Sequence, residues 1–277
     1  MSEQNSKINI LVNEQSQLVN INSTAFDVRD QFKPDADIVI YNASPITENV
    51  TLTQDDRVVL IKRGEIPSRD QLEALMCARH TPGVHEKLKQ GIAGIAGLGG
   101  LGSAIAIALC RIGVGKLILA DFDIVEPSNL NRQQYFVSQI GMTKSQALTE
   151  NLKQINPFIE VESHCVRISE NNIEEIFGSV DVMIEAFDTP DSKAMILESF
   201  AENHSQTPLI LASGLAGFKP NNTIKTRKLG DSIYVVGDTV TEAKPGMGLL
   251  APRVGIAAHQ QANAATRLLL GLPVCND

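Results

Sequence analysis

The sequence predicts an α/β protein built mainly on a doubly wound, mostly parallel sheet, preceded by a small β-rich domain. From residue 91 onward, short apolar segments alternate with helical patterns, as in parallel sheets whose strands are joined by helices. A glycine-rich stretch, GLGGLGS, stands between the first of these strands and the first helix. Residues 7–63 have a different texture, because they contain no glycine and consist of short alternating segments. We therefore expect two domains, residues 1–63 and 91–277, with a connector between them.

The N-terminal region predicts a small ubiquitin-like β-grasp domain. INILV (residues 8–12) and LVNI (residues 18–21) flank a polar stretch and predict a hairpin. TAFDVRDQF (residues 24–32) has apolar side chains at helical spacing, with Thr24 as a candidate cap. DIVIY (residues 37–41) and RVVLIK (residues 57–62) predict two more strands. The order strand, strand, helix, strand, strand is the basis of the β-grasp prediction.

The connector, residues 64–90, is predicted to be helical. SRDQLEALMCARH (residues 68–80) places Leu72, Leu75 and Met76 on one side of a helix. TPGVHEKLKQ (residues 81–90) contains a turn and a second short helix.

The remaining chain predicts a Rossmann-like domain. Strands are expected at residues 91–96, 116–121, 159–166, 180–187 and 209–213. Helices are expected between them, at residues 101–111, 144–155, 172–177 and 190–204. NNTIKTRKL and DSIYVVGD predict two further strands, and residues 252–271 a closing helix.

Composition excludes several classes of protein. The net charge of −8 argues against a general nucleic-acid or anionic-membrane surface, which would need the opposite sign. The four cysteines are far apart and form no CxxC pair, which disfavours a disulfide scaffold or a cysteine-built zinc site and favours a reducing cytoplasm. Residues 91–110 are uncharged and long enough to span a bilayer, but their glycines favour a strand, a turn and a helix start. We therefore expect a cytoplasmic protein with no membrane span.

The glycine-rich stretch predicts a phosphate-binding loop. Gly97, Gly99 and Gly102 form G-x-G-x-x-G, with Gly100 inside the motif, and the motif follows a predicted strand and opens a predicted helix. Glycine permits a tight turn and a close backbone approach to phosphate, and the helix N-terminus offers unpaired N–H groups. Asp121 and Asp123 follow the next strand, where an acidic residue bonds ribose hydroxyls. The alternative is a tight strand–helix crossing without a ligand, and the loop alone fits NAD, FAD, S-adenosylmethionine or ATP equally.

The polar segment after Asp121 favours a triphosphate over a dinucleotide. It supplies Asn129, Arg132 and Gln133 near the predicted loop. Lys144 then falls in the first turn of a helix that the capping box TKSQ begins, where a cation opposes the helix dipole. A residue that opposes a local preference in this way can indicate a functional site. The alternative is a lysine whose side chain extends to water.

A further carboxylate is predicted beside the crevice where open α/β sheets bind ligands. Asp188 follows the strand that ends at Phe187, and Pro190 begins the next helix. Asp188 could hold Mg²⁺ that bridges phosphates. The alternative is a helix-capping aspartate, although Thr189 can already serve as the cap. Hydride transfer needs no such cluster, whereas phosphoryl or adenylyl transfer builds negative charge on the leaving phosphates.

Four stretches carry a family resemblance: GLGGLGS, DFDIVEPSNLNRQ, GMTK and AFDTPDSK. Over residues 78–271 the chain resembles the adenylation domain of ubiquitin-activating-enzyme-like proteins, in particular the ThiF and MoeB adenylyltransferases of sulfur carriers. ARHTPGVHEKLKQ and GMGLLAPRVGIAAHQQAN resemble a ThiF subgroup, and the N-terminal region resembles a fused ThiS-like domain.

The resemblance implies a chemistry. The C-terminal glycine carboxylate of a ThiS-type carrier attacks the α-phosphate of ATP, pyrophosphate leaves, and an acyl-adenylate forms, in thiamine biosynthesis. The resemblance implies that the glycine loop (Gly97, Gly99, Gly100 and Gly102) cradles phosphate, that Asp121 holds the ribose, that Asn129, Arg132 and Lys144 neutralise phosphates, and that Asp188 ligates Mg²⁺. It also implies a homodimer in which an arginine, here Arg79, reaches the partner's ATP.

The chain departs from the family pattern in three places. It has no CxxC pairs, so no zinc is expected. Residues 213–250 contain no cysteine for a covalent intermediate, and Cys110 and Cys165 are expected to be buried and inert. The ThiS-like region continues through IKRGEIPSRDQ without a free Gly-Gly end, so it is expected to be a docking or dimerising module.

Three hypotheses therefore stand. The first is an ATP-dependent adenylyltransferase for a ThiS-type carrier. The second is an NAD-linked oxidoreductase, which the cations and Asp188 disfavour. The third is a non-catalytic ATP-binding regulator whose ubiquitin-like domain is autoinhibitory.

Overall fold

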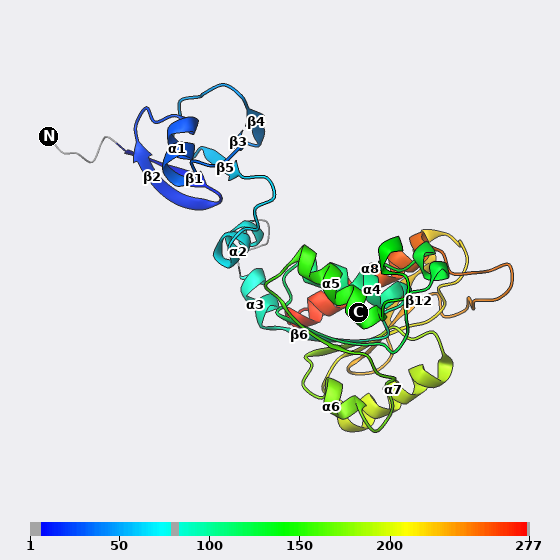
Figure 1. The fold of residues 1–277 in the computed structure, drawn as a ribbon. Coiled ribbons are helices and arrows are strands. Elements are labelled where there is room, and N and C mark those ends of the chain that lie inside the picture. Colours follow the sequence, from blue (N-terminus) through cyan, green and yellow to red (C-terminus); the bar gives the residue numbers. More distant parts are fainter. Residues whose placement is uncertain (1–6, 79–82, 276–277) are drawn as a thin grey trace. The chain divides into compact units, whose positions relative to one another are not determined.

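The structure is a computed structural model, and it describes residues 7–78 and 83–275. The chain divides into two compact units, Met1–Pro82 and Gly83–Asp277. Figure 1 colours the chain along its sequence. The helices of the predicted connector are shared between the units, because α2 (Arg69–Cys77) lies in the first and α3 (Val84–Gln90) in the second.

The first unit contains a five-stranded sheet, and helix α1 (Ala25–Phe32) lies between its second and third strands in the sequence. Its strands are β1 (Lys7–Val12), β2 (Gln15–Asn20), β3 (Ile38–Tyr41), β4 (Ser44–Ile46) and β5 (Arg57–Ile61). The strand order is β2-β1-β5-β3-β4, with β1 and β5 parallel and the other neighbours antiparallel. The predicted β-grasp fold is confirmed.

Local sequence explains most of this unit. The hairpin turns at Asn13 and Glu14, whose φ angles of 47° and 63° match the two-residue turns that fit the twist of antiparallel strands. Thr24 caps α1 as predicted, because its hydroxyl accepts a hydrogen bond from the Asp27 N–H at 3.2 Å. Strand β4 was not predicted, because its three residues include Pro45 and show no alternation.

The second unit is a seven-stranded sheet with helices on both faces. Its strands are β6 (Ile92–Ala96), β7 (Lys116–Ala120), β8 (Glu160–His164), β9 (Val182–Glu185), β10 (Leu209–Ala212), β11 (Lys225–Lys228) and β12 (Ile233–Gly237). Besides α3, its α-helices within the described residues are α4 (Gly100–Arg111), α5 (Lys144–Ile155), α6 (Ile173–Phe177), α7 (Pro190–Asn203) and α8 (Ala251–Leu269). The strand order is β11-β12-β10-β9-β6-β7-β8, and every pair except β11 with β12 is parallel, which confirms the predicted doubly wound sheet.

Two apolar cores hold the helices against this sheet. Helices α4, α5 and α8 cover one face, and α6 and α7 cover the other (Figure 1). Helix α8 packs on α4 through small residues, among them the fully buried Ala257, Ala258 and Ala265. The uncharged residues 91–110 are divided between β6 and α4, and no helix in the described ranges is long and apolar enough to cross a membrane.

The strand order places a crevice at one edge of the sheet. From β6, the chain proceeds to β7 and β8 on one side, and later to β9 and β10 on the other. The connections therefore diverge between β6 and β9, and open α/β sheets bind their ligands beyond the carboxyl ends of the strands at such a point.

Candidate nucleotide-binding site

The glycine loop closes the end of β6 and requires glycine at two positions. Gly97 has a φ of 91°, and a Cβ there would lie 2.8 Å from the carbonyl oxygen of Ala186. A Cβ at Gly102 would lie only 1.8 Å from the carbonyl oxygen of Gly97. The loop can therefore approach the end of β9 and the start of α4 this closely only because Gly97 and Gly102 have no side chain.

The N-terminus of α4 has the properties of an anion-binding site. Gly99 stands at the N-cap position, no side chain caps the helix, and its first turn contains no acidic residue. The first N–H groups of a helix lack intrahelical partners and carry partial positive charge. Phosphate oxygens are the group that such a terminus commonly binds.

Asp121 and Tyr135 fix the backbone of this loop. The two carboxylate oxygens of Asp121 accept hydrogen bonds from the N–H of Leu98 at 2.6 Å and the N–H of Asp123 at 2.8 Å. The hydroxyl of Tyr135 donates to the carbonyl of Leu98 at 2.7 Å. Burial, and then the charges of Asp121 and Asp123, raise the pKa of Tyr135. Each Asp121 oxygen keeps a second lone pair, so the carboxylate can still accept a hydroxyl of a ligand.

Lys144 is buried against the two aspartates. Its Nζ lies 2.8 Å from Oδ2 of Asp123 and 4.0 Å from Oδ2 of Asp121, and its side chain is 7% exposed. The alternative of a lysine that extends to water is therefore wrong, because the carboxylates at the end of β7 hold the ammonium in place. They also compensate the unfavourable position of a cation in the first turn of α5.

The predicted capping box before α5 is only half formed. Thr143 accepts a hydrogen bond from the N–H of Gln146 at 3.3 Å. The side chain of Gln146 instead donates to Glu150 at 3.1 Å. The i and i+4 positions face each other on a helix, so this contact competes with the return bond to Thr143.

The segment after Asp123 contains three predicted side chains, of which those of Arg132 and Gln133 lie at the start of α4. Asn129 is buried and accepts a hydrogen bond from the N–H of Glu126 at 3.1 Å. The guanidinium of Arg132 donates only to neutral oxygens and has no carboxylate partner within residues 83–275. Its aliphatic part lies against Gly100, where a Cβ would be 3.3 Å from Cγ of Arg132.

Gln133 offers an unused acceptor beside the loop. Its side chain is buried, its Nε2 is 3.8 Å from the position of a Cβ on Gly99, and its Oε1 has no hydrogen-bond partner. A buried polar atom without a partner is costly in a native protein and calls for an explanation. A ligand donor or a bound water at the loop would supply the missing bond.

Asp188 lies on the turn that follows β9, whose first residues contact the glycine loop. It comes two residues after Ala186, whose N–H donates to the carbonyl of Ala96 at 2.8 Å and whose own carbonyl lies against Gly97. The Asp188 side chain is exposed and makes no hydrogen bond or ion pair within the described part of the chain. Thr189 stands at the N-cap of α7 as predicted but does not cap it, because its hydroxyl donates to Ser192 at 2.8 Å.

These observations fit a magnesium ion that is held partly by phosphates. The free carboxylate of Asp188 is a suitable hard oxygen ligand, and Mg²⁺ usually takes one or two carboxylates together with substrate phosphates. No group of three or more His, Cys, Asp or Glu side chains that could hold a metal by itself occurs among the residues described.

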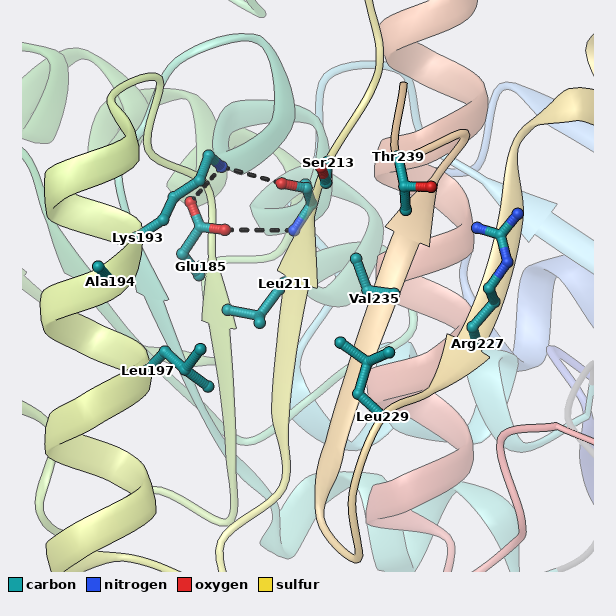
Figure 2. Close-up of a pocket in the computed structure, with 11 residues that line it drawn as sticks. Glu185, Lys193, Ala194, Leu197, Leu211, Ser213, Arg227, Leu229, Val235 and Thr239 are labelled. Atoms are coloured by element: carbon teal, nitrogen blue, oxygen red, sulfur yellow. Dashed lines mark hydrogen bonds and ion pairs between the residues drawn. The ribbon is translucent and has the colours of Figure 1, made fainter. Parts of the chain in front are cut away.

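Two charged pairs at the same edge were not predicted. Glu185, fully buried at the end of β9, pairs with Lys193 of α7 at 2.7 Å (Figure 2). Burial raises the pKa of Glu185, and Lys193 opposes that effect. An acidic residue in an otherwise apolar strand, VMIEAF, is the sequence signal that could have indicated this pair.

The other pair joins Asp238, just beyond β12, to Arg253 in the first turn of α8. Arg253 donates to Asp238 at 2.8 Å and also to the carbonyl of Lys219 at 3.1 Å. Although burial acts in the opposite direction, backbone N–H groups of Thr241 and Val240 lower the pKa of Asp238 to about 2. An arginine in a first helical turn is again the local signal.

The remaining predictions concern Arg79 and two cysteines. Arg79 lies outside the described residues. Cys110 is buried as predicted, and burial raises the pKa of its thiol to about 12. The prediction for Cys165 is wrong, because this thiol is exposed. Strand β8 ends at His164, two residues earlier than predicted, so Cys165 belongs to the loop beyond it.

Comparisons with known proteins agree with this architecture. Residues 73–276 match the ThiF family, and residues 8–64 match the ThiS-like ubiquitin family. The chain is 32% identical over 171 residues to the adenylyltransferase and sulfurtransferase UBA4 of Kluyveromyces lactis, a match over 59% of this chain and 38% of that protein. The Saccharomyces cerevisiae protein of the same name is 29% identical over 171 residues. The chain thus spans well under half the length of these relatives.

Solved structures share the fold at lower sequence identity. The Escherichia coli tRNA N6-threonylcarbamoyladenosine dehydratase TcdA, in complex with ATP, has a TM-score of 0.67 at 19% identity and covers 75% of this chain and 98% of its own. Escherichia coli MccB with ATP has a TM-score of 0.51 at 20% identity and covers 67% of this chain and 57% of its own.

Proposed function

Because the chain belongs to the ThiF family, we propose that it transfers the adenylyl group of ATP to a carboxylate. The observation that carries this proposal is the uncapped N-terminus of α4, together with Arg132 and Asp188, neither of which is engaged by an opposite charge among the described residues. These groups suit a substrate that gains negative charge on its leaving phosphates.

The residues divide the binding of ATP between them. The glycine loop (Gly97, Gly99, Gly100 and Gly102) receives phosphate oxygens through backbone N–H groups. Asp121 and the half-exposed Asp123 accept ribose hydroxyls. Asn129, Arg132, Gln133 and Lys144 line the phosphate side. Mg²⁺, held by Asp188 and phosphate oxygens, would offset charge on the leaving pyrophosphate.

The reaction is a substitution at the α-phosphorus. A carboxylate oxygen of the acceptor forms a bond to the α-phosphorus, and the bond from that phosphorus to the bridging α,β-oxygen breaks. The electron pair leaves with pyrophosphate, and an acyl-adenylate remains. Arg132, whose positive charge has no carboxylate partner within residues 83–275, stabilises the developing negative charge.

The acceptor is proposed to be the C-terminal glycine carboxylate of a ubiquitin-like sulfur carrier of the ThiS type. Support comes from relatives that are named adenylyltransferase and sulfurtransferase and from the ThiS-like unit of this chain. Thiamine biosynthesis is the proposed pathway, and a homodimer in which Arg79 reaches the partner's ATP is the proposed assembly.

A second candidate function is regulation. The ubiquitin-like unit does not end in Gly-Gly after β5 but continues into α2, which Ser68 caps. A carrier-like unit that cannot be adenylated could instead compete with a carrier. This reading predicts that the chain binds ATP but supports no exchange that depends on a carrier.

The test is ATP–pyrophosphate exchange by the purified chain, with and without a ThiS-type carrier that ends in Gly-Gly. Exchange that depends on the carrier supports adenylation, and a carrier that lacks its last glycine is the control. ATP binding without exchange in either condition would favour the regulatory function. Nicotinamide binding in place of ATP binding would support the oxidoreductase hypothesis instead.

A further inference from the structure

Asp188 lies in a short exposed turn that it does not stabilise itself. The turn runs from the end of β9 at Glu185 to the start of α7 at Pro190. Asp188 has no partner within the described residues, and Thr189 does not cap the helix. A metal-side carboxylate must nevertheless be held in place, because a shift of about 1 Å in a reacting group can cost on the order of a hundredfold in rate.

A buried clamp holds both ends of this turn. One carboxylate oxygen of Glu185 accepts hydrogen bonds from the N–H of Phe187 at 2.6 Å and from Nζ of Lys193 at 2.7 Å. Lys193 lies in α7, just after the turn, and Phe187 is the residue before Asp188. We define the clamp as Glu185 and Lys193.

The clamp is anchored on the neighbouring strand. The other carboxylate oxygen of Glu185 accepts a hydrogen bond from the N–H of Ala212 at 3.2 Å. Nζ of Lys193 donates to the carbonyl of Ala212 at 3.0 Å. Figure 2 shows both side chains converging on the end of β10. Strand β9, strand β10 and helix α7 are therefore joined at one point, by residues that stand three positions before and five positions after Asp188 in the chain.

The surroundings make each member of the clamp depend on the other. Glu185 is fully buried, whereas the side chain of Lys193 is 29% exposed toward an open hollow of about 420 Å³. The hollow is walled mainly by aliphatic side chains such as Leu197, Leu211 and Val235, and Glu185 is its only acidic lining residue. Loss of Glu185 would thus leave Lys193 without a carboxylate among the lining residues, and loss of Lys193 would remove the ion-pair partner of the fully buried Glu185, with Arg227 the other cation of the lining.

Stability alone does not explain such a pair. Taking a carboxylate out of water is expensive, and well-packed apolar residues often replace a buried ion pair without loss of stability. A pair whose hydrogen bonds all fall on the turn before Asp188 and on the adjacent strand has a geometric role instead. We infer that Glu185 and Lys193 are positioning residues, which set the place of the Asp188 carboxylate relative to the glycine loop; this inference rests on the proposed function.

The test measures how strongly Mg²⁺ improves nucleotide binding, without any turnover. The nucleotide is α,β-methylene ATP, whose adenylyl group cannot be transferred to an acceptor because a methylene group replaces the α,β-bridging oxygen. Its dissociation constant is measured by calorimetry with Mg²⁺ and with a chelator, and the ratio of the two constants is the readout. We expect Lys193→Met to lower this ratio roughly tenfold, the scale seen when residues behind a metal ligand are removed, and to leave the metal-free constant unchanged.

Three further variants make the result decisive. Lys193→Arg keeps the charge and is expected to restore most of the ratio. Glu185→Gln/Lys193→Met removes both charges, so it should fold even if a single variant does not, and its ratio should also fall. Lys116→Met is the matched control, because Lys116 is 25% exposed and pairs with Glu160 and Glu162 at the other end of the same sheet.

The outcomes separate the inference from the function on which it rests. If Asp188→Asn lowers the ratio but the folded Lys193 and double variants keep it, the positioning role is overturned while the metal-side assignment survives. If Asp188→Asn leaves the ratio unchanged, the metal-side assignment itself fails. If Lys116→Met lowered the ratio of dissociation constants equally, the effect would be a general one on the sheet, and the inference would also be overturned.

Discussion

The two units of the chain bury charge in different ways. In the first unit, Asp56 is the one charged side chain that is buried among the residues described, and its partners are neutral: Tyr41, Asn42 and Thr53. In the second unit the buried charged groups gather at one edge of the sheet. They are Asp121, Lys144, Glu185, Asp238 and Arg253.

The charges of the second unit follow one arrangement. A carboxylate stands at or just after the end of a parallel strand, and a cation from the early part of a helix meets it. The pairs are Lys144 with Asp123 at 2.8 Å, Lys193 with Glu185 at 2.7 Å, and Arg253 with Asp238 at 2.8 Å. Cations are unfavourable at helix N-termini, so their repetition there identifies the strand ends as the place where charge has been concentrated.

This contrast indicates that buried charges have different roles in the two units. Asp56 accepts hydrogen bonds that close a turn, which is a structural task. The charges of the second unit stand at the carboxyl ends of its strands, as the glycine loop does, and they leave Arg132 and Asp188 without opposite charges among the residues described. Four predictions can break or sharpen this comparison.

The largest expected effect is on catalysis. Arg132→Met should lower carrier-dependent ATP–pyrophosphate exchange by about 10²–10³-fold, the usual scale for one group that stabilises transition-state charge. Circular dichroism should show an unchanged fold, because Arg132 bonds only to neutral oxygens of its own segment. Asp56→Asn is the control from the other unit and should leave exchange intact. Exchange lost equally in both variants would remove the functional difference between the units.

The next effect is on stability and is confined to the first unit. Asp56→Ala leaves the hydroxyl of Tyr41, the amide of Asn42 and the N–H of Thr53 without their acceptor. The free energy of unfolding of this unit should fall by about 2–3 kcal/mol in a urea titration. Asp55→Asn is the control, because asparagine also tolerates the φ of 68° at this position and only an exposed carboxylate bonded by Gln54 is changed. An unfolding midpoint shared with Asp55→Asn would contradict the structural role of Asp56.

A smaller effect depends on pH. The pKa of Asp238 is lowered to about 2 in the folded state, so its ionised form stabilises the fold. That contribution, on the order of 1–2 kcal/mol, is complete above the ordinary pKa of about 3.9 and is lost as the pH falls through about 2. In acid titrations monitored by circular dichroism, Asp238→Asn should be less stable than the wild type near neutral pH. Its stability should also change less than that of the wild type between about pH 3.9 and about pH 2. A parallel profile in wild type and variant would exclude this linkage.

The smallest effect concerns the two thiols of the second unit that differ most in exposure. Cys165 is exposed, whereas the buried Cys110 has a pKa raised to about 12. Because the thiolate is the reactive form, an alkylating reagent should modify Cys165 first and Cys110 only on unfolding. Mass spectrometry of digested protein gives the order. Cys165→Ser should change the free energy of unfolding by less than about 0.5 kcal/mol, as an exposed substitution does.

The sequence by itself determined the order of elements and most of their positions. Alternating apolar segments, Thr24 as a cap and Pro190 at a helix start are local signals, because the backbone responds to neighbours within one turn or one strand. The glycine pattern likewise placed the loop, since only glycine fits at Gly97 and Gly102.

Only the tertiary structure decided how the charges at the crevice are used. Tyr135 holds Leu98 across 37 positions of the chain, and Glu185 reaches Ala212 across 27. Lys144 reads as an exposed cation in a sequence, yet the ends of β7 and α5 bring it between two aspartates. No local pattern encodes these contacts, because they exist only where the carboxyl ends of parallel strands are placed side by side and water is excluded.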